Sequence, residues 1–174
     1  ESVYMPQVED NVNAIRFPFF RNGECINIKS RDGQKNFRME SGAERIFYGL
    51  DDISETTIIV EGEMDKLAME EAGYQHCISV PDGAPTPKAK DYNSKFEFIA
   101  GCEEELSKVK TFILAVDNDS PGQLLQEELA RRLGKEKCKL VTWPDGCKDA
   151  NEVLLEYGAG GIANAIETAR DYPI

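Results

Sequence analysis

The sequence predicts an α/β fold in which a Rossmann-like, mainly parallel sheet is flanked by helices and preceded by a small basic antiparallel β lobe. From residue 57 onward, short apolar runs alternate with helical patterns, as in the right-handed β-α-β units of a parallel sheet. Upstream, runs of alternating polarity are separated by Asn22-Gly23 and Asp32-Gly33, dipeptides typical of hairpin turns. We therefore expect an N-terminal lobe over residues 1–55 and an α/β domain over residues 56–174.

The N-terminal lobe is expected to hold three strands. Residues 1–12 show no strong periodicity and are expected to form an arm. Residues 14–20 are rich in aromatic side chains, and Pro18 restricts this strand to a sheet edge or a bulge because proline has no N–H to donate. Residues 25–31 and 35–39 alternate apolar and polar side chains, as half-buried strands do.

Residues 41–55 connect the lobe to the α/β domain, and their segment 47–50 is expected to pack into a core. Four apolar runs are expected to form the parallel strands: residues 57–60, 77–80, 112–116 and 138–143. Helical patterns occur at residues 64–72, 92–106 and 120–133, from 149 onward, and at 161–170. Ser120 is the expected N-cap of the third helix, with Pro121 at its first position.

Composition excludes several classes of function. No apolar run approaches the roughly 20 residues of a membrane span, so we expect no membrane partner. The five cysteines never form a CxxC pair, which argues against a disulfide framework and against a zinc site. His76 is the only histidine, so a Ser-His-Asp or Cys-His site has a single candidate histidine and an HExxH site, which needs two, cannot form.

Charge is distributed unevenly along the chain. The net charge is −12, yet residues 16–45 carry seven basic and four acidic side chains. A basic lobe beside an acidic body can hold a nucleic-acid backbone locally, although a solvated charged hairpin would show the same pattern. The candidate nucleic-acid-binding residues of the lobe are Arg16, Lys29, Arg31, Lys35 and Arg38.

Aromatic side chains are interleaved with these cations, namely Phe17, Phe19, Phe20 and Phe37. Their rings could stack on the bases of a single strand. Aromatic residues at strand spacing are more often part of a core, so both alternatives stay open for each ring.

Two acidic clusters follow the first and third predicted strands of the parallel sheet. Ligands bind at the carboxyl ends of strands in open α/β sheets, so the clusters are expected to share a rim. Carboxylates gathered there would repel one another unless a hard cation such as Mg²⁺ or Mn²⁺ neutralised them. Simple helix capping would explain one acid at each place but not both clusters. The candidate catalytic residues are Glu61, Glu63, Asp65, Asp117 and Asp119.

Alternation adds a geometric expectation about these acids. In an extended segment Glu61 and Glu63 point the same way, as do Asp117 and Asp119, so each pair could address one ion. Metal ions that bridge phosphate oxygens support phosphoryl transfer. The residues alone therefore predict a divalent-metal site for phosphoryl-transfer chemistry.

The two clusters also carry a family resemblance. Segments 60–65 and 116–119 resemble the paired acidic motifs of the TOPRIM family, which primases, topoisomerases and certain nucleases share. Lys148-Asp149-Ala150-Asn151 narrows the resemblance to bacterial (DnaG-type) and T7-type phage primases. Segments 48–53 and 79–85 look most like plant organellar Twinkle-type primase–helicases or their shorter primase homologues.

The resemblance implies roles for individual residues. The implied metal ligands are Glu61, Asp117, Asp119 and Asp149. For Asp149 a plain N-cap is an equal alternative, because Asp-x-x-Glu at a helix start needs no other reason. The implied nucleotide-binding residues are Lys88, Lys90 and Lys148. For Lys88 and Lys90 a solvated loop is the alternative.

The implied activity is that of a DNA primase core, a nucleotidyltransferase that joins ribonucleoside triphosphates into RNA primers on single-stranded DNA with Mg²⁺ or Mn²⁺. The resemblance further implies a helicase domain or partner, an organellar DNA polymerase as partner, and a location in chloroplasts or mitochondria, although no transit peptide is visible in this sequence. The chain departs from related primases in having no cysteine-rich zinc module and no GxxxxGK[ST] P-loop.

Two other functions share these features. A TOPRIM-type nuclease would use the same acids for metal-dependent cleavage, and a non-catalytic primase remnant would only bind single-stranded DNA. A haloacid-dehalogenase site also begins with Asp-x-Asp after a strand. Pro121 occupies the position where that family has Thr or Val, and the acids of segment 61–65 would be left unexplained.

Overall fold

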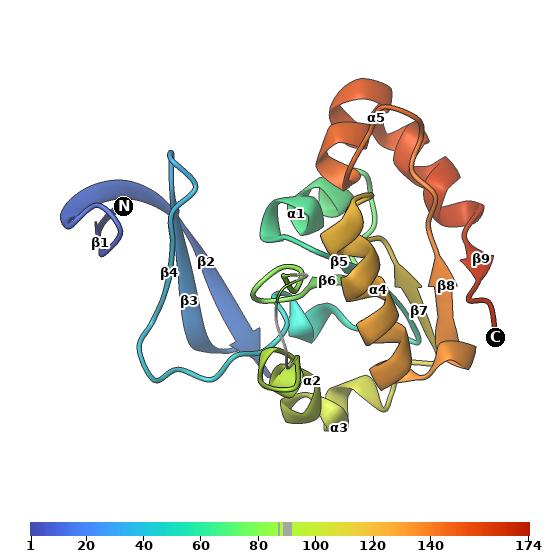
Figure 1. Cartoon of the computed structure of the whole chain (residues 1–174), viewed down its shortest axis with the longest axis horizontal. Coiled ribbons are helices and arrows are strands. Elements are labelled where there is room, and N and C mark those ends of the chain that lie inside the picture. Colours follow the sequence, from blue (N-terminus) through green and yellow to red (C-terminus); the bar gives the residue numbers. More distant parts are fainter. Residues whose placement is uncertain (87, 89–91) are drawn as a thin grey trace.

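The computed structural model describes residues 1–86, 88 and 92–174. Their strands form two sheets, which Figure 1 shows at the left and the right: a four-stranded sheet in the order β1-β2-β3-β4 and a five-stranded sheet in the order β6-β5-β7-β8-β9. Neighbours in the first sheet are antiparallel. In the second sheet β6, β5, β7 and β8 are parallel, and β9 runs antiparallel to β8. The predicted α/β fold with a preceding antiparallel lobe is confirmed.

The N-terminal sheet is built on one long strand. Its members are β1 (Ser2–Met5), β2 (Asp10–Arg21), β3 (Glu24–Asp32) and β4 (Phe37–Met39). The start of β2 pairs with β1, and the rest of β2 pairs with β3. Pro18 lies beyond the part that pairs with β1, and the register shifts between Phe19 and Phe20. The expected edge or bulge position of Pro18 is confirmed.

The arm expected over residues 1–12 is wrong. β1 and β2 form a hairpin in which Val3 pairs with Val12. Val3 and Met5 are both buried, at the spacing of two that a strand requires. Such a short strand offers too few residues for periodicity to reveal it.

The second sheet and its helices follow the expected alternation. Its strands are β5 (Thr56–Val60), β6 (Cys77–Ser79), β7 (Thr111–Leu114), β8 (Cys138–Leu140) and β9 (Arg170–Asp171). The α-helices are α1 (Glu63–Glu71), α2 (Glu97–Gly101), α3 (Glu103–Leu106), α4 (Ser120–Leu133) and α5 (Ala150–Glu167). Short 3₁₀ segments are Leu50–Asp52, Ser94–Phe96 and Lys135–Lys137. Within the described ranges, no helix has both the length and the apolar character needed to cross a bilayer.

Several element boundaries differ from expectation. The helix expected over residues 92–106 is divided into a 3₁₀ turn, α2 and α3, because Cys102 leaves helical geometry at φ −112°. The two helices expected after residue 149 are merged in α5, which is kinked where Gly158 adopts φ 69°. The N-cap of α4 is Asp119 rather than Ser120, since the Asp119 carboxylate accepts a hydrogen bond from the Gly122 N–H at 2.8 Å. The β9 strand was not expected.

Side chains of β5 alternate between two hydrophobic clusters, one on each face of the second sheet. Ile59 belongs to the cluster that contains residues of α4, whereas Ile58 and Val60 belong to the cluster beneath α1 and α5. A parallel sheet covered on both faces needs such continuously apolar strands. The carboxyl ends of these strands are therefore the places where polar groups reach the surface.

The hydrophobic cluster that contains Ile59 also joins the N-terminal lobe to the α/β body. Phe17 and Phe19 of β2 lie in the same core as Phe47 and Ile59. Tyr48 packs edge-on against both Phe17 and Phe19, at ring-centroid distances of 5.8 and 5.2 Å. The expected packing role of segment 47–50 is confirmed. The N-terminal lobe is thus held against the α/β body by apolar contacts, while its assignment as a separate domain stays a prediction.

One buried ion pair adds a directional link between the lobes. The Lys29 ammonium of β3 donates to Glu63 Oε1 at 2.7 Å and to the Pro81 carbonyl at 2.8 Å. Lys29 is 8% exposed and Glu63 is 5% exposed. Removing one partner of a buried pair leaves an uncompensated charge, so each member depends on the other.

We expect Lys29→Met to lower the free energy of unfolding by about 3–5 kcal/mol, because Glu63 would remain buried without its counter-charge. The double variant Lys29→Met, Glu63→Gln is expected to recover most of this loss. Lys110→Met is the matched control, since the Lys110–Glu55 pair is largely exposed and worth at most about 1 kcal/mol. Urea denaturation measures all three, and equal losses for Lys29→Met and Lys110→Met would contradict the assignment.

Candidate metal centre

Three aspartates from distant parts of the chain meet at the carboxyl ends of β5 and β7. Asp65 lies in the first turn of α1, Asp117 follows β7, and Asp149 is the N-cap of α5. Carboxylate oxygens of the three residues lie within 4.8 Å of one another. We call Asp65, Asp117 and Asp149 the acidic triad. This spacing allows one cation to contact an oxygen of each residue.

Backbone amides fix two members of the triad. Asp149 Oδ1 accepts from the Glu152 N–H at 2.9 Å, so the predicted capping role of Asp149 is present and leaves its second oxygen for another partner. Asp65 Oδ1 accepts from the Asn151 N–H at 3.1 Å, which ties α1 to the start of α5. Both carboxylates are thereby oriented before any ligand arrives.

Asp117 carries the clearest sign of a missing partner. Its Oδ1 atom is buried and has no hydrogen-bond partner in the part of the chain that the structure describes. Its Oδ2 atom lies 3.8 Å from the Lys148 ammonium, a longer contact than a hydrogen bond. A buried carboxylate oxygen without a donor is costly, and a hard divalent cation would satisfy it. The donor set therefore fits Mg²⁺ or Mn²⁺, both of which prefer carboxylate oxygen.

The predicted ligands Glu61 and Asp119 border the triad. Glu61 Oε1 accepts from the Asp117 N–H at 3.3 Å. Asp119 caps α4, so one of its oxygens is already occupied by the Gly122 N–H. Neither residue belongs to the trio of closest oxygens, whereas Asp65, expected to be a catalytic acid rather than a ligand, does. Their roles in metal binding stay predictions.

The extended segment expected to align Glu63 with Glu61 is interrupted. The chain turns at Gly62 into α1, so Glu63 is the first residue of a helix rather than part of an extended segment. Its carboxylate points to Lys29 instead. Helix formation immediately after β5 overrides the two-residue period that an extended chain would have kept.

Gly122 was not singled out by sequence reasoning, yet it shapes the rim. A Cβ atom at this position would lie 2.0 Å from the Asp117 carbonyl oxygen. Only glycine allows the start of α4 to approach the strand end so closely. The sequence held one sign of this role: glycine has a poor propensity for helices, yet Gly122 lies in the first turn of a predicted helix.

Burial and mutual repulsion make these acids hard to ionise. Burial raises the pKa of the Asp117 carboxyl to about 8, and the charges of Glu61, Asp65 and Asp149 add to the shift. Burial also raises the pKa of Asp65 to about 7, with Asp149 as the main charged neighbour. The pKa of Glu61 is raised by burial and by Asp119. Without a cation, the site therefore holds protons near neutral pH.

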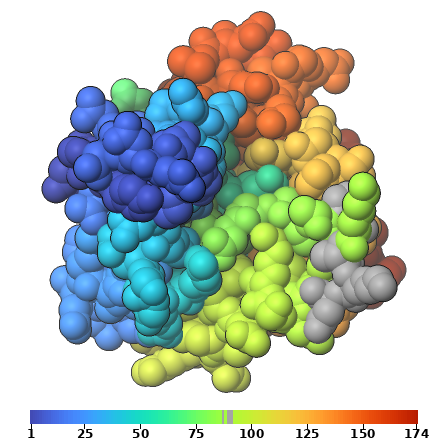
Figure 2. Space-filling model, turned by 60° about the vertical axis from the view of Figure 1, so that its left-hand side comes forward, coloured from blue at the N-terminus to red at the C-terminus, as the bar shows by residue number. Residues whose placement is uncertain are grey.

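A groove of about 470 Å³ separates this rim from the N-terminal lobe. Arg31, Lys35 and Phe37 line its lobe side, and Asp65 and Asp149 line the opposite side. Figure 2 shows the lobe in blue standing in front of the α/β body, with α5 in orange above it. Positive and negative walls thus face each other across one groove.

The predicted phosphate-binding residues are placed unequally. Arg31 and Lys35 line the groove, and Lys148 lies half-exposed at the rim. Lys29 is buried, and Arg16 forms ion pairs with Glu1 and Glu40. Arg38 is partly buried in β4, Lys88 is exposed, and Lys90 lies outside the described residues.

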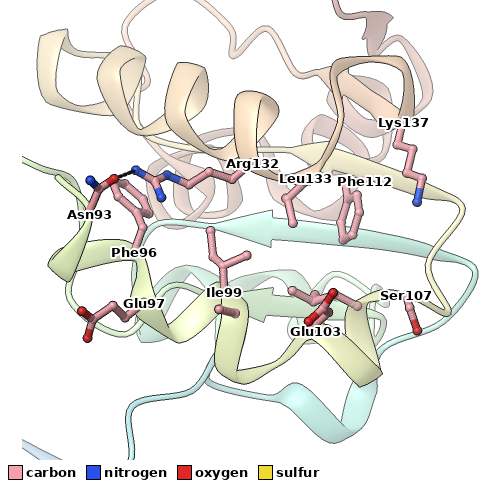
Figure 3. Close-up of a pocket in the computed structure, with 12 residues that line it drawn as sticks. Asn93, Phe96, Glu97, Ile99, Glu103, Ser107, Phe112, Arg132, Leu133 and Lys137 are labelled. Carbon is pink, nitrogen blue, oxygen red and sulfur yellow. Dashed lines mark hydrogen bonds between the residues drawn. The ribbon is translucent and has the colours of Figure 1, made fainter.

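A larger cavity of about 700 Å³ lies away from the acids. Figure 3 shows its apolar side chains, Phe96, Ile99, Phe112 and Leu133, gathered between the α2–α3 segment and α4. The Arg132 guanidinium donates to Asn93 Oδ1 at 3.0 Å and lies over the Phe96 ring. None of the residues lining this cavity belongs to the acidic triad, so size does not identify the candidate site here.

Comparison with known proteins shows which family the chain resembles. Residues 55–142 match the Toprim domain model. The chain is 46% identical over 185 residues to the Primase homolog protein of Arabidopsis thaliana, and 44% identical over 185 residues to the Twinkle homolog protein, chloroplastic/mitochondrial, of the same plant. Both alignments cover 99% of this chain, but 55% and 26% of the relatives. The chain therefore spans about half the length of the first relative and about a quarter of the second.

Solved structures show the same fold. The primase domain of bacteriophage T7, in a complex of the lagging-strand DNA polymerase with primase domains bound to an RNA/DNA hybrid and dTTP, superposes with a TM-score of 0.75 at 27% identity, covering 94% of this chain and 81% of that one. The primase fragment of the T7 primase-helicase gives 0.71 at 26% identity, covering 90% and 63%. The Escherichia coli primase catalytic core gives 0.66 at 18% identity, covering 90% and 52%.

Asp117→Asn is expected to stabilise the metal-free protein, and to do so more at a pH of about 8 than at about 5. Folding raises the pKa of Asp117 from 3.8 to about 8. Between these two pH values the folded protein keeps a proton that the unfolded chain has lost, so the free energy of unfolding falls as the pH rises. Asparagine removes that loss. Allowing for solvent screening of a partly exposed carboxyl, we expect a gain of about 1–3 kcal/mol at the higher pH. Urea denaturation with a chelator present measures it.

Asp145→Asn is the matched control for this experiment, because Asp145 is exposed and lies outside the groove lining. It should change stability equally little at both pH values. Mg²⁺ should raise the melting temperature of the wild type more than that of Asp117→Asn, since a ligand that binds only the folded state stabilises it. A gain for Asp117→Asn that does not depend on pH would contradict the repulsion argument.

Proposed function

The chain belongs to the Toprim domain family, and from that premise we propose that it is the RNA-polymerising core of a DNA primase. In this function it binds single-stranded DNA as template and joins ribonucleoside triphosphates into an RNA primer with Mg²⁺ or Mn²⁺. The primer 3′-hydroxyl attacks the α-phosphate of the incoming nucleotide, a new phosphodiester bond forms, and pyrophosphate leaves. The relatives named as primases support the reaction class.

The proposal rests on the acidic triad, two of whose members, Asp65 and Asp149, line a groove that has Arg31 and Lys35 on its other side. Oxygens of Asp65, Asp117 and Asp149 lie within 4.8 Å of one another, and Asp117 Oδ1 is buried without a partner. These carboxylates would hold a divalent cation, which would supply positive charge to a phosphoryl centre and its leaving group. Arg31 and Lys35 on the opposite wall supply charge for a template backbone.

The chain's own residues prepare this chemistry in two ways. Amides of Glu152 and Asn151 hold the Asp149 and Asp65 carboxylates in place, which fixes their geometry in advance. Lys148 lies 3.8 Å from Asp117 Oδ2, and the charge of Asp117 raises the pKa of this lysine. With a cation held by Asp117, the half-exposed Lys148 ammonium would be available to bind a nucleotide phosphate.

We extend the proposal to the setting of the protein. A relative is named chloroplastic/mitochondrial and as a Twinkle homologue, which supports action in plant organelles beside a helicase domain or partner. A T7 structure is described as a DNA polymerase interacting with primase domains, which supports an organellar DNA polymerase as a further partner. In this setting the RNA primers that the chain makes would be the starting points of new DNA strands during replication.

Asp117→Asn and Asp119→Asn are each expected to reduce template-dependent incorporation of labelled ribonucleotides by at least about 100-fold, because the metal site supplies several kcal/mol of transition-state stabilisation. Asp145→Asn should retain wild-type incorporation. The assay runs with Mg²⁺ and with Mn²⁺, on several templates and with a zinc-binding module supplied separately. Wild-type protein that makes no product under any of these conditions would refute the proposal, and metal-dependent cleavage of labelled DNA would identify a nuclease instead.

A further inference from the structure

One aromatic ring of the N-terminal lobe is exposed in the groove, and this sets Phe37 apart. Phe17 and Phe19 are 2% and 0% exposed and belong to the core. Phe20 is 39% exposed, but it does not line the groove. Phe37 is 43% exposed and lines the groove wall that faces Asp65 and Asp149. Phe17 also borders the groove, but its side chain is buried in the core, so among the lobe's phenylalanines only Phe37 has an exposed ring there.

Neighbouring groups hold this ring in place. The Lys29 ammonium lies 4.7 Å from the Phe37 ring centroid, and the Arg31 guanidinium carbon lies 5.8 Å from it. Lys29 is itself fixed by Glu63 and the Pro81 carbonyl, so the ring rests against an immobile cation. The Phe37 carbonyl accepts from Gln7 Nε2 at 2.7 Å, and its backbone pairs with Arg31. The ring is therefore positioned without a ligand.

We propose that Phe37 is a base-stacking residue for single-stranded DNA, a proposal that rests on the function proposed above. The ring stacks on an unpaired nucleobase of the template, while Arg31 and Lys35 hold the neighbouring phosphates. Aromatic rings beside cations are the common elements of single-strand binding grooves, because every base has a π-face and every nucleotide carries a phosphate. A groove of about 470 Å³ has the size of sites that enclose one small ligand, such as a nucleotide.

The chemistry of the groove favours a single-stranded template over two other ligands. Bases in a duplex are already stacked on one another, so their faces are not available to Phe37. An incoming triphosphate needs its phosphates near the metal site, whereas Phe37 shares its wall with Arg31 and Lys35. The aromatic and basic groups together on one wall suit a strand that lies along the lobe.

The test compares Phe37→Ala with Phe20→Ala, two phenylalanines of similar exposure in the same lobe. Binding of a short labelled oligothymidylate is measured by fluorescence anisotropy with a chelator present, so that no metal-dependent reaction occurs. Phe37→Ala is expected to weaken binding by about 5- to 100-fold, the range measured for loss of one stacking ring. Phe20→Ala and Phe37→Trp should stay within about twofold of the wild type.

Salt dependence separates stacking from electrostatics. Phe37→Ala should lower affinity at every salt concentration without changing the slope of log K against log [salt], because it removes no charge. Lys35→Met should make that slope shallower by about 0.7, the value for one phosphate contact on a single strand. A changed slope in Phe37→Ala would mean that the ring acts by positioning Arg31, and would overturn the proposal.

A tryptophan at position 37 reports on contact with the base directly, so this measurement does not depend on how stable Phe37→Ala is. In Phe37→Trp, added oligothymidylate should quench the fluorescence of the new indole, whereas the fluorescence of Phe20→Trp should stay unquenched above the constant background of the buried Trp143. If the wild type binds single strands and Phe37→Ala matches Phe20→Ala, the stacking proposal fails and the proposed function stands. If Phe37→Ala weakens binding of a ribonucleoside triphosphate but not of the strand, stacking on the template is refuted. If the wild type binds no single strand even at low salt, template binding itself fails.

Discussion

Repulsion among buried and partly buried carboxylates at the carboxyl ends of β5 and β7 is the constraint on which the rest of the structure depends. Asp65, Asp117 and Asp149 are brought within 4.8 Å of one another by three different elements, and burial raises the pKa of Asp117 to about 8. Such a cluster opposes folding unless other contacts offset it. The apolar clusters on both faces of the parallel sheet supply those contacts, and so the core stabilises a site that would otherwise separate.

The position of the N-terminal lobe against the α/β body is also set by apolar packing and by charge. Phe17 and Phe19 share a core with the α/β body, which fixes the distance between the lobes. The buried Lys29–Glu63 pair then fixes their orientation, because an ion pair requires a specific geometry where an apolar contact does not. The groove between Arg31 and Asp149 is therefore present in the protein without a ligand.

Sequence patterns predicted the parts of this site that depend on local order. Apolar runs that end in Asp117 and in Glu61 located the rim, and Asp149 was placed at a helix start. The patterns could not predict contacts between distant segments. Asp65 joins the triad through an amide 86 residues away, and Lys29 meets Glu63 across 34 residues. Both depend on how helices and lobes pack, which periodicity within one segment does not contain.

The lobe's cations and the rim's acids lie on different sides of the groove, so the proposed template binding and catalysis would be separable steps. The net charge of −12 would repel a nucleic acid at long range, but it is screened over about 8–10 Å at physiological salt. Within that range the proposed template would meet Arg31 and Lys35, while Asp65 and Asp149 lie on the other wall. A phosphate can approach the acidic wall only when a cation has neutralised it. Under the proposed function, the lobe would hold a strand without metal, whereas a nucleotide phosphate would approach Asp65 and Asp149 only with a cation bound.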